Sequence, residues 1–266
     1  MEKTKVLFIS QEIAPYLPET EMSAISRNLP QGIQEKGKEI RTFMPRFGSI
    51  NERRHQLHEV IRLSGMNLII NDSDHPLLIK VASIQSARMQ VYFIDNEEYF
   101  HRKETVANED GVYFEDNDER ILFFARGVLE TTKKLRWAPD VIHCHGWFTA
   151  LAPLLIKKLM HDDPFFANSK VVYSVYDNAF TGEMNNKLKQ KVKAMGLSEK
   201  DIKILETPTY LNLSRLALNM SDGIIRGSKE IDSEFEKYII DSGKPFLKYG
   251  EGADYINAIN KFYDDL

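Results

Sequence analysis

Cysteine, long apolar runs and an excess of one charge are all scarce or absent in this sequence. Cys144 is the single cysteine among 266 residues, so no disulfide can form within the chain, and a reducing compartment, the cytoplasm, is expected. The net charge of −4 comes from side chains spread along the chain, so neither nucleic acid nor a membrane is expected as a partner. No apolar run approaches the roughly 18 residues of a membrane span, and no signal core is evident at the N-terminus.

Glycine is missing from the first strand-to-helix turn, where many phosphate-binding proteins need it. The turn covers residues 10–21 (SQEIAPYLPETE), between the apolar run of residues 6–9 and a helix whose apolar residues recur every three or four positions. Neither a GxGxxG nor a P-loop pattern occurs, so close approach of the backbone to a phosphate is hindered there. The turn still lies where parallel α/β sheets bind ligands, beyond the carboxyl end of a strand.

Alternating strand and helix patterns fill the rest of the chain. Strands are expected at residues 6–9, 39–44, 141–145, 170–174 and 222–226, and helices at 22–33, 116–135, 148–160, 185–195, 211–220, 229–240 and 254–266. Short β-prone segments between residues 56 and 94 indicate an antiparallel hairpin insertion, and the lysines of residues 185–195 are expected to form a solvated face. With 42% hydrophobic residues and no linker, we expect one α/β domain over residues 1–266, a Rossmann-like, doubly wound and mostly parallel sheet.

Two histidines and a cysteine cluster at the strand end of residues 141–145. His143 and His145 alternate to the same side of a strand, so they are either wall residues of one cleft or hydrogen-bonded histidines of the core. Cys144 points to the other face, which does not suit a Cys–His nucleophilic pair. No second cysteine is available as a zinc ligand, so we expect no metal and no cofactor.

Aromatic residues are plentiful, with 15 Phe and 11 Tyr, and most of those at helical spacing belong to the core. Four aromatic residues lie instead at expected strand ends or in loops: Tyr16, Trp147, Tyr176 and Phe180. In those places an aromatic ring can stack on a sugar. A sugar-binding role for these four residues is therefore the alternative to a purely structural role.

Seven short segments stand out in order along the chain: VLFISQEIAP (6–15), LP (29–30), PRFG (45–48), VYFIDNEEYFHR (91–102), YFEDNDERILFFARGVLE (113–130), PDVIHCHGWFTALA (139–152) and SVYDNAFTG (174–182). Together and in this order they resemble the N-terminal catalytic domain of bacterial glycogen synthases and plant starch synthases. The match runs from residue 5 to about residue 234. Members of this family are retaining glucosyltransferases that extend α-1,4-glucan from ADP-glucose. The resemblance therefore implies one lobe of the two-lobed GT-B architecture.

The resemblance also implies a sugar-contacting cleft, with an α-glucan or maltooligosaccharide as its ligand. Its candidate residues are Tyr92, Asn96, Arg102, His145, Trp147, Tyr176, Asp177 and Asn178. The family's His-Asp-Trp-His segment reads His145, Gly146, Trp147, Phe148 here, and its Ile-His-Asn segment reads Val175, Tyr176, Asp177. An acidic residue and two histidines of the family pattern are therefore absent from the cleft.

The donor loop departs further from the family pattern. The family's Lys-Thr-Gly-Gly-Leu, whose lysine and glycines face the sugar nucleotide, reads Pro18, Glu19, Thr20, Glu21, Met22 in this sequence. Two carboxylates in place of a cation repel a diphosphate. The resemblance thus implies a degenerate donor loop, and binding of ADP-glucose is not expected of this chain alone.

Length adds a further expectation. Synthases of this family carry a second Rossmann-like domain that binds most of the ADP-glucose, and 266 residues leave no room for it. Residues 255–265 resemble the family's last helix, and the region of residues 241–266 is expected to dock on the domain. Three hypotheses for function follow: a degenerate lobe that binds glucan or regulates its metabolism, an active transferase completed by a separate C-terminal lobe, and an interaction domain, such as a homodimer, with a vestigial cleft.

Overall fold

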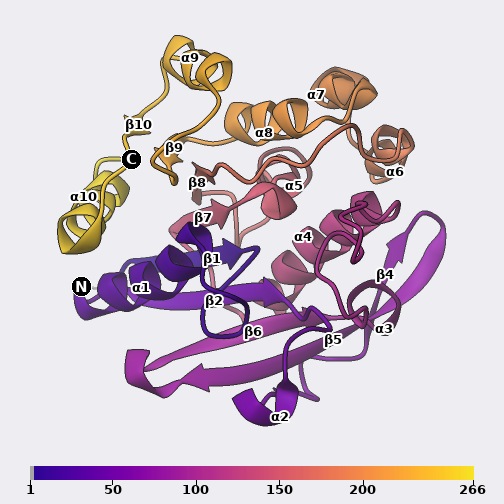
Figure 1. Ribbon diagram of the computed structural model, residues 1–266, viewed down its shortest axis with the longest axis horizontal. Coiled ribbons are helices and arrows are strands. Elements are labelled where there is room, and N and C mark those ends of the chain that lie inside the picture. The colour runs from indigo at the N-terminus through magenta and orange to yellow at the C-terminus, as the bar shows by residue number, and fades with distance from the viewer. Residues whose placement is uncertain (1–2) are drawn as a thin grey trace.

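Strand β1 (Lys5–Ser10) lies inside a ten-stranded sheet (Figure 1). In the computed structural model, which describes residues 3–266, β1 pairs in parallel with β2 (Glu39–Pro45) on one side and with β7 (Val141–His145) on the other. The four apolar residues from Val6 to Ile9 are fully buried. A continuous apolar run is needed here because helices cover both faces of the sheet at this strand.

The strand order is β10-β9-β8-β7-β1-β2-β6-β5-β3, with β4 paired to β5. The other parallel strands are β6 (Met89–Asp95), β8 (Lys170–Val175), β9 (Gly223–Arg226) and β10 (Phe246–Leu247). The antiparallel strands are β3 (His58–Glu59), β4 (Met66–Ile70) and β5 (Ser73–Ile84). The predicted fold class, a mostly parallel α/β sheet with a hairpin insertion, is therefore confirmed.

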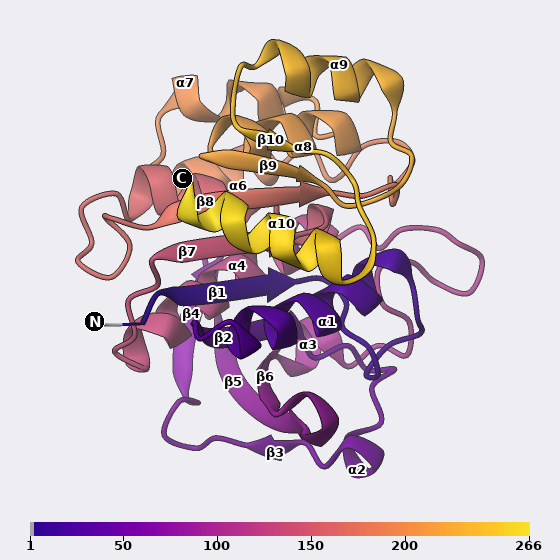
Figure 2. The same ribbon diagram turned by 90° about the vertical axis from the view of Figure 1, so that its left-hand side faces the viewer.

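Helices cover both faces of the sheet. Figure 2 shows α1 (Glu21–Glu35) and α10 (Gly252–Asp264) side by side on one face, with α4 (Asn117–Lys134) behind the sheet. The remaining helices are α2 (Glu52–His55), α3 (Glu97–Phe100), α5 (Leu151–Leu154), α6 (Leu188–Ala194), α7 (Glu199–Ile202), α8 (Tyr210–Asn219) and α9 (Ser233–Asp241). No helix among residues 3–266 is both long enough and apolar enough to cross a bilayer.

Two expected helices differ in detail from the observed ones. The segment expected as one helix over residues 148–160 is a 3₁₀ turn, then α5, then a π-helical turn at Leu155–Leu159. Pro153 lies in this segment and has no amide hydrogen to donate, so regular α-helical hydrogen bonding is interrupted. Helix α9 begins at Ser233 instead of residue 229, because the carboxylate of Asp232 accepts the amide hydrogen of Phe235 and caps the helix.

Helix α10 packs closely on the rest of the domain. A Cβ atom added to Gly32 of α1 would lie 2.6 Å from Cγ2 of Ile256, so the two helices approach closely here and a larger residue would require Ile256 to shift. On its buried side, α10 places the hydroxyl of Tyr263 2.6 Å from Nδ1 of His143 in β7. The helix is thus fastened both to its neighbour and to the centre of the sheet.

The lysine-rich helix is not uniformly solvated, so that expectation is wrong for Lys191. The side chain of Lys191 in α6 is only 4% exposed, and its Nζ lies 2.5 Å from Oδ2 of Asp118 and 2.8 Å from Oε1 of Glu119 in α4. Burial lowers the pKa of Lys191, but its hydrogen bonds to the two carboxylates outweigh burial and leave the pKa raised. This buried ion pair joins α6 to α4.

Substituting methionine for Lys191 tests this link. The variant Lys191→Met leaves the fully buried Asp118 without its cation, so we expect the free energy of unfolding at pH 7 to fall by about 3 kcal/mol in urea denaturation. Because the folded-state pKa of Lys191 is raised, its stabilisation is complete at neutral pH and is lost as the pH rises through that pKa.

Lys193→Met is the matched control. Its ammonium pairs with Glu199 at 3.0 Å, but the side chain is 59% exposed, so we expect a loss below about 1 kcal/mol. Equal losses for the two variants would contradict the assignment of a buried ion pair to Lys191.

Candidate functional site

Two adjoining pockets lie at the carboxyl edge of the sheet, beyond the ends of β7 and β8. The first, the tryptophan pocket, has a volume of about 290 Å³ and is lined by Tyr113, Phe114, Glu115, Asn117, Trp147, Phe180, Thr181, Glu183, Met184 and Asn185. The second, the tyrosine pocket, has a volume of about 320 Å³ and is lined by Val175, Tyr176, Asp177, Ala179, Phe180, Gly182, Thr209, Tyr210, Leu211, Ile231, Asp232 and Phe235. Phe180 belongs to both linings, so the two pockets share a wall.

Aromatic rings surround that shared wall. The ring centroid of Phe180 lies 5.0 Å from that of Trp147, and 6.0 Å from the centroids of both Tyr113 and Tyr210, in edge-on arrangements. Carboxylate and amide side chains border the same pockets, among them Glu183 and Asp177. Apolar ring faces beside polar acceptors and donors suit a ligand that has both C–H surfaces and hydroxyl groups.

The two histidines of β7 lie beneath this edge and are fully buried. His143 contacts hydroxyls with both ring nitrogens, Tyr263 through Nδ1 at 2.6 Å and Ser174 through Nε2 at 2.7 Å. His145 lies 2.7 Å from the hydroxyl of Tyr176 through Nδ1, while its Nε2 has no partner among residues 3–266. Both histidines are therefore hydrogen-bonded residues of the core and not wall residues of a cleft, which was the other interpretation of their spacing.

Burial also decides the charge of these groups. It lowers the pKa of His143 far below its usual value, with a smaller contribution from His145, and it lowers the pKa of His145 to about 3. Both imidazoles are therefore neutral at pH 7. Burial raises the pKa of the Cys144 thiol well above its usual range, so this cysteine is not an activated nucleophile.

The start of α1 faces the same edge, but the side chain of Thr20 already caps it. The hydroxyl of Thr20 accepts the amide hydrogen of Ser23 at 3.0 Å and donates to Oε2 of Glu12 at 2.9 Å. Glu19 and Glu21 are exposed beside this cap. Burial raises the pKa of Glu12, an effect that the hydrogen bond from Thr20 only partly offsets. Three carboxyl groups thus surround the helix terminus that could otherwise attract an anion.

Comparison with known proteins identifies the family. A sequence model of the starch synthase catalytic domain matches residues 5–254. The chain belongs to this family. The glycogen synthase of Chlorobium limicola is 37% identical over 189 residues, which are 71% of this chain and 39% of that protein. The glycogen synthase of Chlorobium chlorochromatii is 39% identical over 183 residues, 65% of this chain and 36% of that protein.

A solved structure shows the same fold. The catalytic domain of starch synthase IV from Arabidopsis thaliana, bound to ADP and acarbose, superposes with a TM-score of 0.73 at 16% identity, over 94% of this chain and 52% of that one. The predicted starch synthase resemblance and the single GT-B lobe are both confirmed. The chain spans about two fifths of the length of the glycogen synthases it matches.

The starch synthase lobe brings together only part of the predicted cleft. Trp147 lines the tryptophan pocket, and Tyr176 and Asp177 line the tyrosine pocket. Asn178 follows Asp177 in the chain, and its side-chain oxygen and nitrogen are buried without a partner among the described residues. His145 lines neither pocket and can act on a ligand only through its contact with Tyr176.

Three other predicted residues lie elsewhere. Asn96 caps α3 by accepting the amide hydrogen of Tyr99, and it donates to the carbonyl of Pro76. Arg102 forms an ion pair with Asp116, with one N–O distance of 2.6 Å. Tyr92 lines a pocket at the opposite edge of the sheet. These contacts give Asn96 and Arg102 structural partners within the domain.

Sequence patterns did not single out Tyr113, Tyr210 or Phe235 as pocket residues, although all three line the carboxyl-edge pockets. Tyr113 precedes α4, whereas Tyr210 and Phe235 lie on α8 and α9, and only the folded sheet brings these segments together. Among residues 3–266, no three His, Cys, Asp or Glu side chains gather in a way that could hold a metal ion.

The contact between Tyr176 and His145 predicts a measurable loss of stability. Tyr176→Phe removes the hydroxyl that contacts Nδ1 of His145 and leaves this buried ring without a partner on either nitrogen. We expect the free energy of unfolding to fall by about 1–3 kcal/mol. Tyr16→Phe is the control, because the Tyr16 hydroxyl is buried without a partner in the described chain, and its removal is expected to be neutral or stabilising. Similar changes in the two variants would refute the proposed hydrogen bond.

Proposed function

We propose that the carboxyl-edge pockets of this starch synthase family domain bind an α-1,4-glucan or maltooligosaccharide. The observation that carries the proposal is the shared wall of Phe180 between two pockets of about 290 and 320 Å³. Two adjoining pockets of this size suit a chain of successive sugar units better than one compact ligand.

The side chains around the pockets support recognition of a neutral sugar. Trp147, Phe180 and Tyr210 supply apolar ring faces and edges, against which the C–H faces of glucose units can pack. Asp177 and Asp232 on one side, and Glu183 and Asn185 on the other, supply acceptors and donors for hydroxyl groups. Neither lining contains lysine or arginine, so the proposed ligand need not be an anion.

The start of α1 supports the further proposal that this chain does not transfer glucose from ADP-glucose by itself. Stabilising a departing diphosphate requires cations or free amide hydrogens placed where negative charge develops. Residues 11–21 contain no lysine or arginine, and the cap of α1 is held by Thr20 with Glu19 and Glu21 beside it. The proposed role is therefore glucan binding, or regulation of glucan metabolism through such binding.

A partner chain that supplies a second lobe would give the alternative function, an active glucosyltransferase. The glycogen synthase relatives are more than twice as long as the segment they share with this chain, which is compatible with a lobe supplied separately. A homodimer with a vestigial cleft is the third possibility. These alternatives differ in the ligands that the isolated chain binds.

Calorimetric titration with maltoheptaose tests glucan binding. We expect the purified chain to bind maltoheptaose, and Phe180→Ala to weaken binding by at least about tenfold, because the variant removes apolar surface from both pockets. Phe165→Ala is the control, since Phe165 precedes β8 at the opposite edge and lines neither pocket. Absence of heat with maltoheptaose, or equal loss in both variants, would reject the glucan-binding role.

Titration with ADP-glucose separates the binding domain from the transferase. We expect no binding to the isolated chain, because the carboxylates of Glu19 and Glu21 repel the diphosphate. The double variant Glu19→Gln, Glu21→Gln measures this repulsion directly. Binding of ADP-glucose to the unaltered chain would show that the substituted loop is not disabling and would favour the transferase.

A further inference from the structure

Arg120 is a fully buried arginine without a carboxylate partner. It lies near the start of α4 and has no exposed surface, and the nearby Asp116 pairs with Arg102 instead. Burial lowers the pKa of Arg120 to about 9, which the charge of Asp116 only partly opposes, so the guanidinium is still charged at pH 7. A buried charge with no counter-charge costs free energy of folding, so its presence here requires an explanation.

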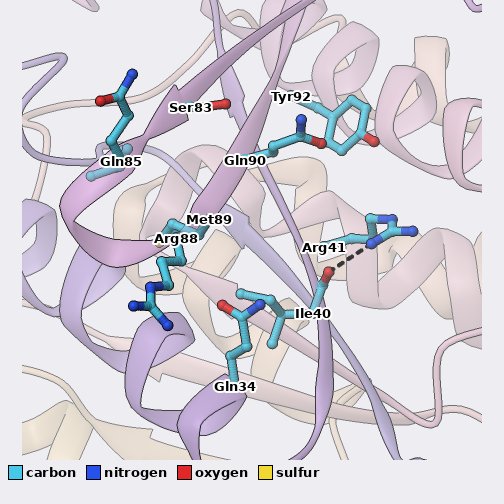
Figure 3. Close-up of a pocket in the computed structure, with 10 residues that line it drawn as sticks. Gln34, Ile40, Arg41, Ser83, Gln85, Arg88, Met89, Gln90 and Tyr92 are labelled. Atoms are coloured by element: carbon cyan, nitrogen blue, oxygen red, sulfur yellow. Dashed lines mark hydrogen bonds between the residues drawn. The ribbon is translucent and has the colours of Figure 1, made fainter.

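The arginines at the opposite edge of the sheet are arranged differently. They border a pocket of about 380 Å³ where β2 and β6 begin, and Figure 3 shows the guanidinium groups of Arg41 and Arg88 turned away from each other. Arg41 pairs with Glu39 at 3.5 Å, and Arg88 is exposed to solvent. Neither of them carries the desolvation cost that burial imposes on Arg120.

All three nitrogens of the Arg120 guanidinium donate hydrogen bonds around the loop that precedes α4. Nε donates to the carbonyl of Tyr99 at 2.7 Å, one terminal nitrogen to Oδ1 of Asn117 at 2.6 Å, and the other to the carbonyl of Thr105 at 2.7 Å. Nδ2 of Asn117 donates in turn to the carbonyl of Val106 at 2.8 Å. Because the donors of a guanidinium lie in one rigid plane, they fix these acceptors relative to one another.

Aromatic rings enclose the same guanidinium. Its Cζ atom lies between 5.4 and 5.7 Å from the ring centroids of Phe47, Phe100, Phe114 and Phe148. Attraction between the cation and these rings offsets part of the cost of burial. Two of the rings belong to the surroundings of the tryptophan pocket: Phe114 lines it, and the ring centroid of Phe148 lies 5.4 Å from that of Trp147, which also lines it.

The two walls of the tryptophan pocket are joined through Arg120. One wall comes from the segment 113–117, and the other from Trp147 and the segment 180–185. Arg120 contacts the first wall directly and reaches the second through Phe148, which packs on Trp147. The two walls are far apart in the sequence, so side-chain contacts of this kind set their spacing.

We propose that Arg120 is a positioning residue of the tryptophan pocket, which holds the loop of residues 101–116, between α3 and α4, where Tyr113 and Phe114 meet the glucan. Arg120 lines neither pocket and so acts on the ligand only through this loop. An apolar side chain could fill the space between the four rings, but it could not satisfy the three acceptors. The proposal rests on the glucan-binding function proposed above.

Calorimetric titration of the full chain with maltoheptaose tests this role in the variant Arg120→Met. We expect its affinity to be at least about tenfold lower, because the loop loses the hydrogen bonds that fix it. Arg126→Met is the matched control, since Arg126 also lies on α4 and donates to a backbone carbonyl, that of Ile69 at 2.7 Å, but lines neither pocket. We expect this control to bind maltoheptaose as the unaltered chain does.

Hydrogen exchange, followed by mass spectrometry, reports on the loop itself. In Arg120→Met we expect faster exchange of the amide hydrogens of residues 101–116 and unchanged exchange in β1 and β7, whereas a general loss of stability would speed exchange in the strands as well. Arg120→Lys keeps the charge but not the planar set of donors, so we expect an intermediate affinity. In the unaltered chain, maltoheptaose is expected to slow exchange in the same loop.

The possible failures are distinguishable. Unchanged affinity in folded Arg120→Met, or an equal loss in Arg126→Met, would reject the role of Arg120 and leave glucan binding in place. Maltoheptaose that binds the unaltered chain without slowing exchange in residues 101–116 would do the same, even if no Arg120 variant folds. Failure of the unaltered chain to bind maltoheptaose would reject the glucan-binding function and, with it, the role of Arg120.

Discussion

The structure depends on complete burial of β1, whose residues Val6–Ile9 have no exposed surface. A strand buried on both faces forms only if helices cover both faces, and here α1 and α10 supply one cover while α4 lies on the other side (Figure 2). The strands beside β1 run parallel to it, so their carboxyl ends gather the connecting loops at one edge. The position of the carboxyl-edge pockets follows from this packing.

Burial also sets the electrostatics of the site. The same packing that covers β7 removes water from His143 and His145, so the edge has two neutral imidazoles beneath it instead of two cations. Around the start of α1 the formal charges are negative, from Glu12, Glu19 and Glu21. An uncharged sugar meets little electrostatic cost in such surroundings, whereas a negatively charged diphosphate is repelled.

The fold was largely predictable from the sequence because apolar periodicity reports burial directly. The run at β1 and the stripe of α1 are read from neighbouring residues alone. The ion pair of Lys191 was not predictable, because its partners Asp118 and Glu119 are brought to it by packing of α4 against α6.

Within the site, the family motifs identified Trp147, Tyr176 and Asp177 as neighbours of the pockets. The same motifs also contain Asn96 and Arg102, whose side chains are held by a helix cap and an ion pair, and a motif does not separate these roles. Phe180 forms a wall common to two pockets because of the path of the loop after β8. No local sequence pattern encodes that path.

The hydrogen bond between Tyr263 and His143 has a consequence for how the chain reaches this structure. Its two partners are 120 residues apart in sequence. Helices α1 and α10, which pack against each other, are separated by an even longer stretch of chain. Closing so large a loop costs conformational entropy before any contact repays it, and folding rates fall as such distant contacts become more important. The docking of α10 therefore carries a high loop-closure cost, and the face beneath it is uncovered until α10 docks. During that interval its apolar strands are open to association with other chains.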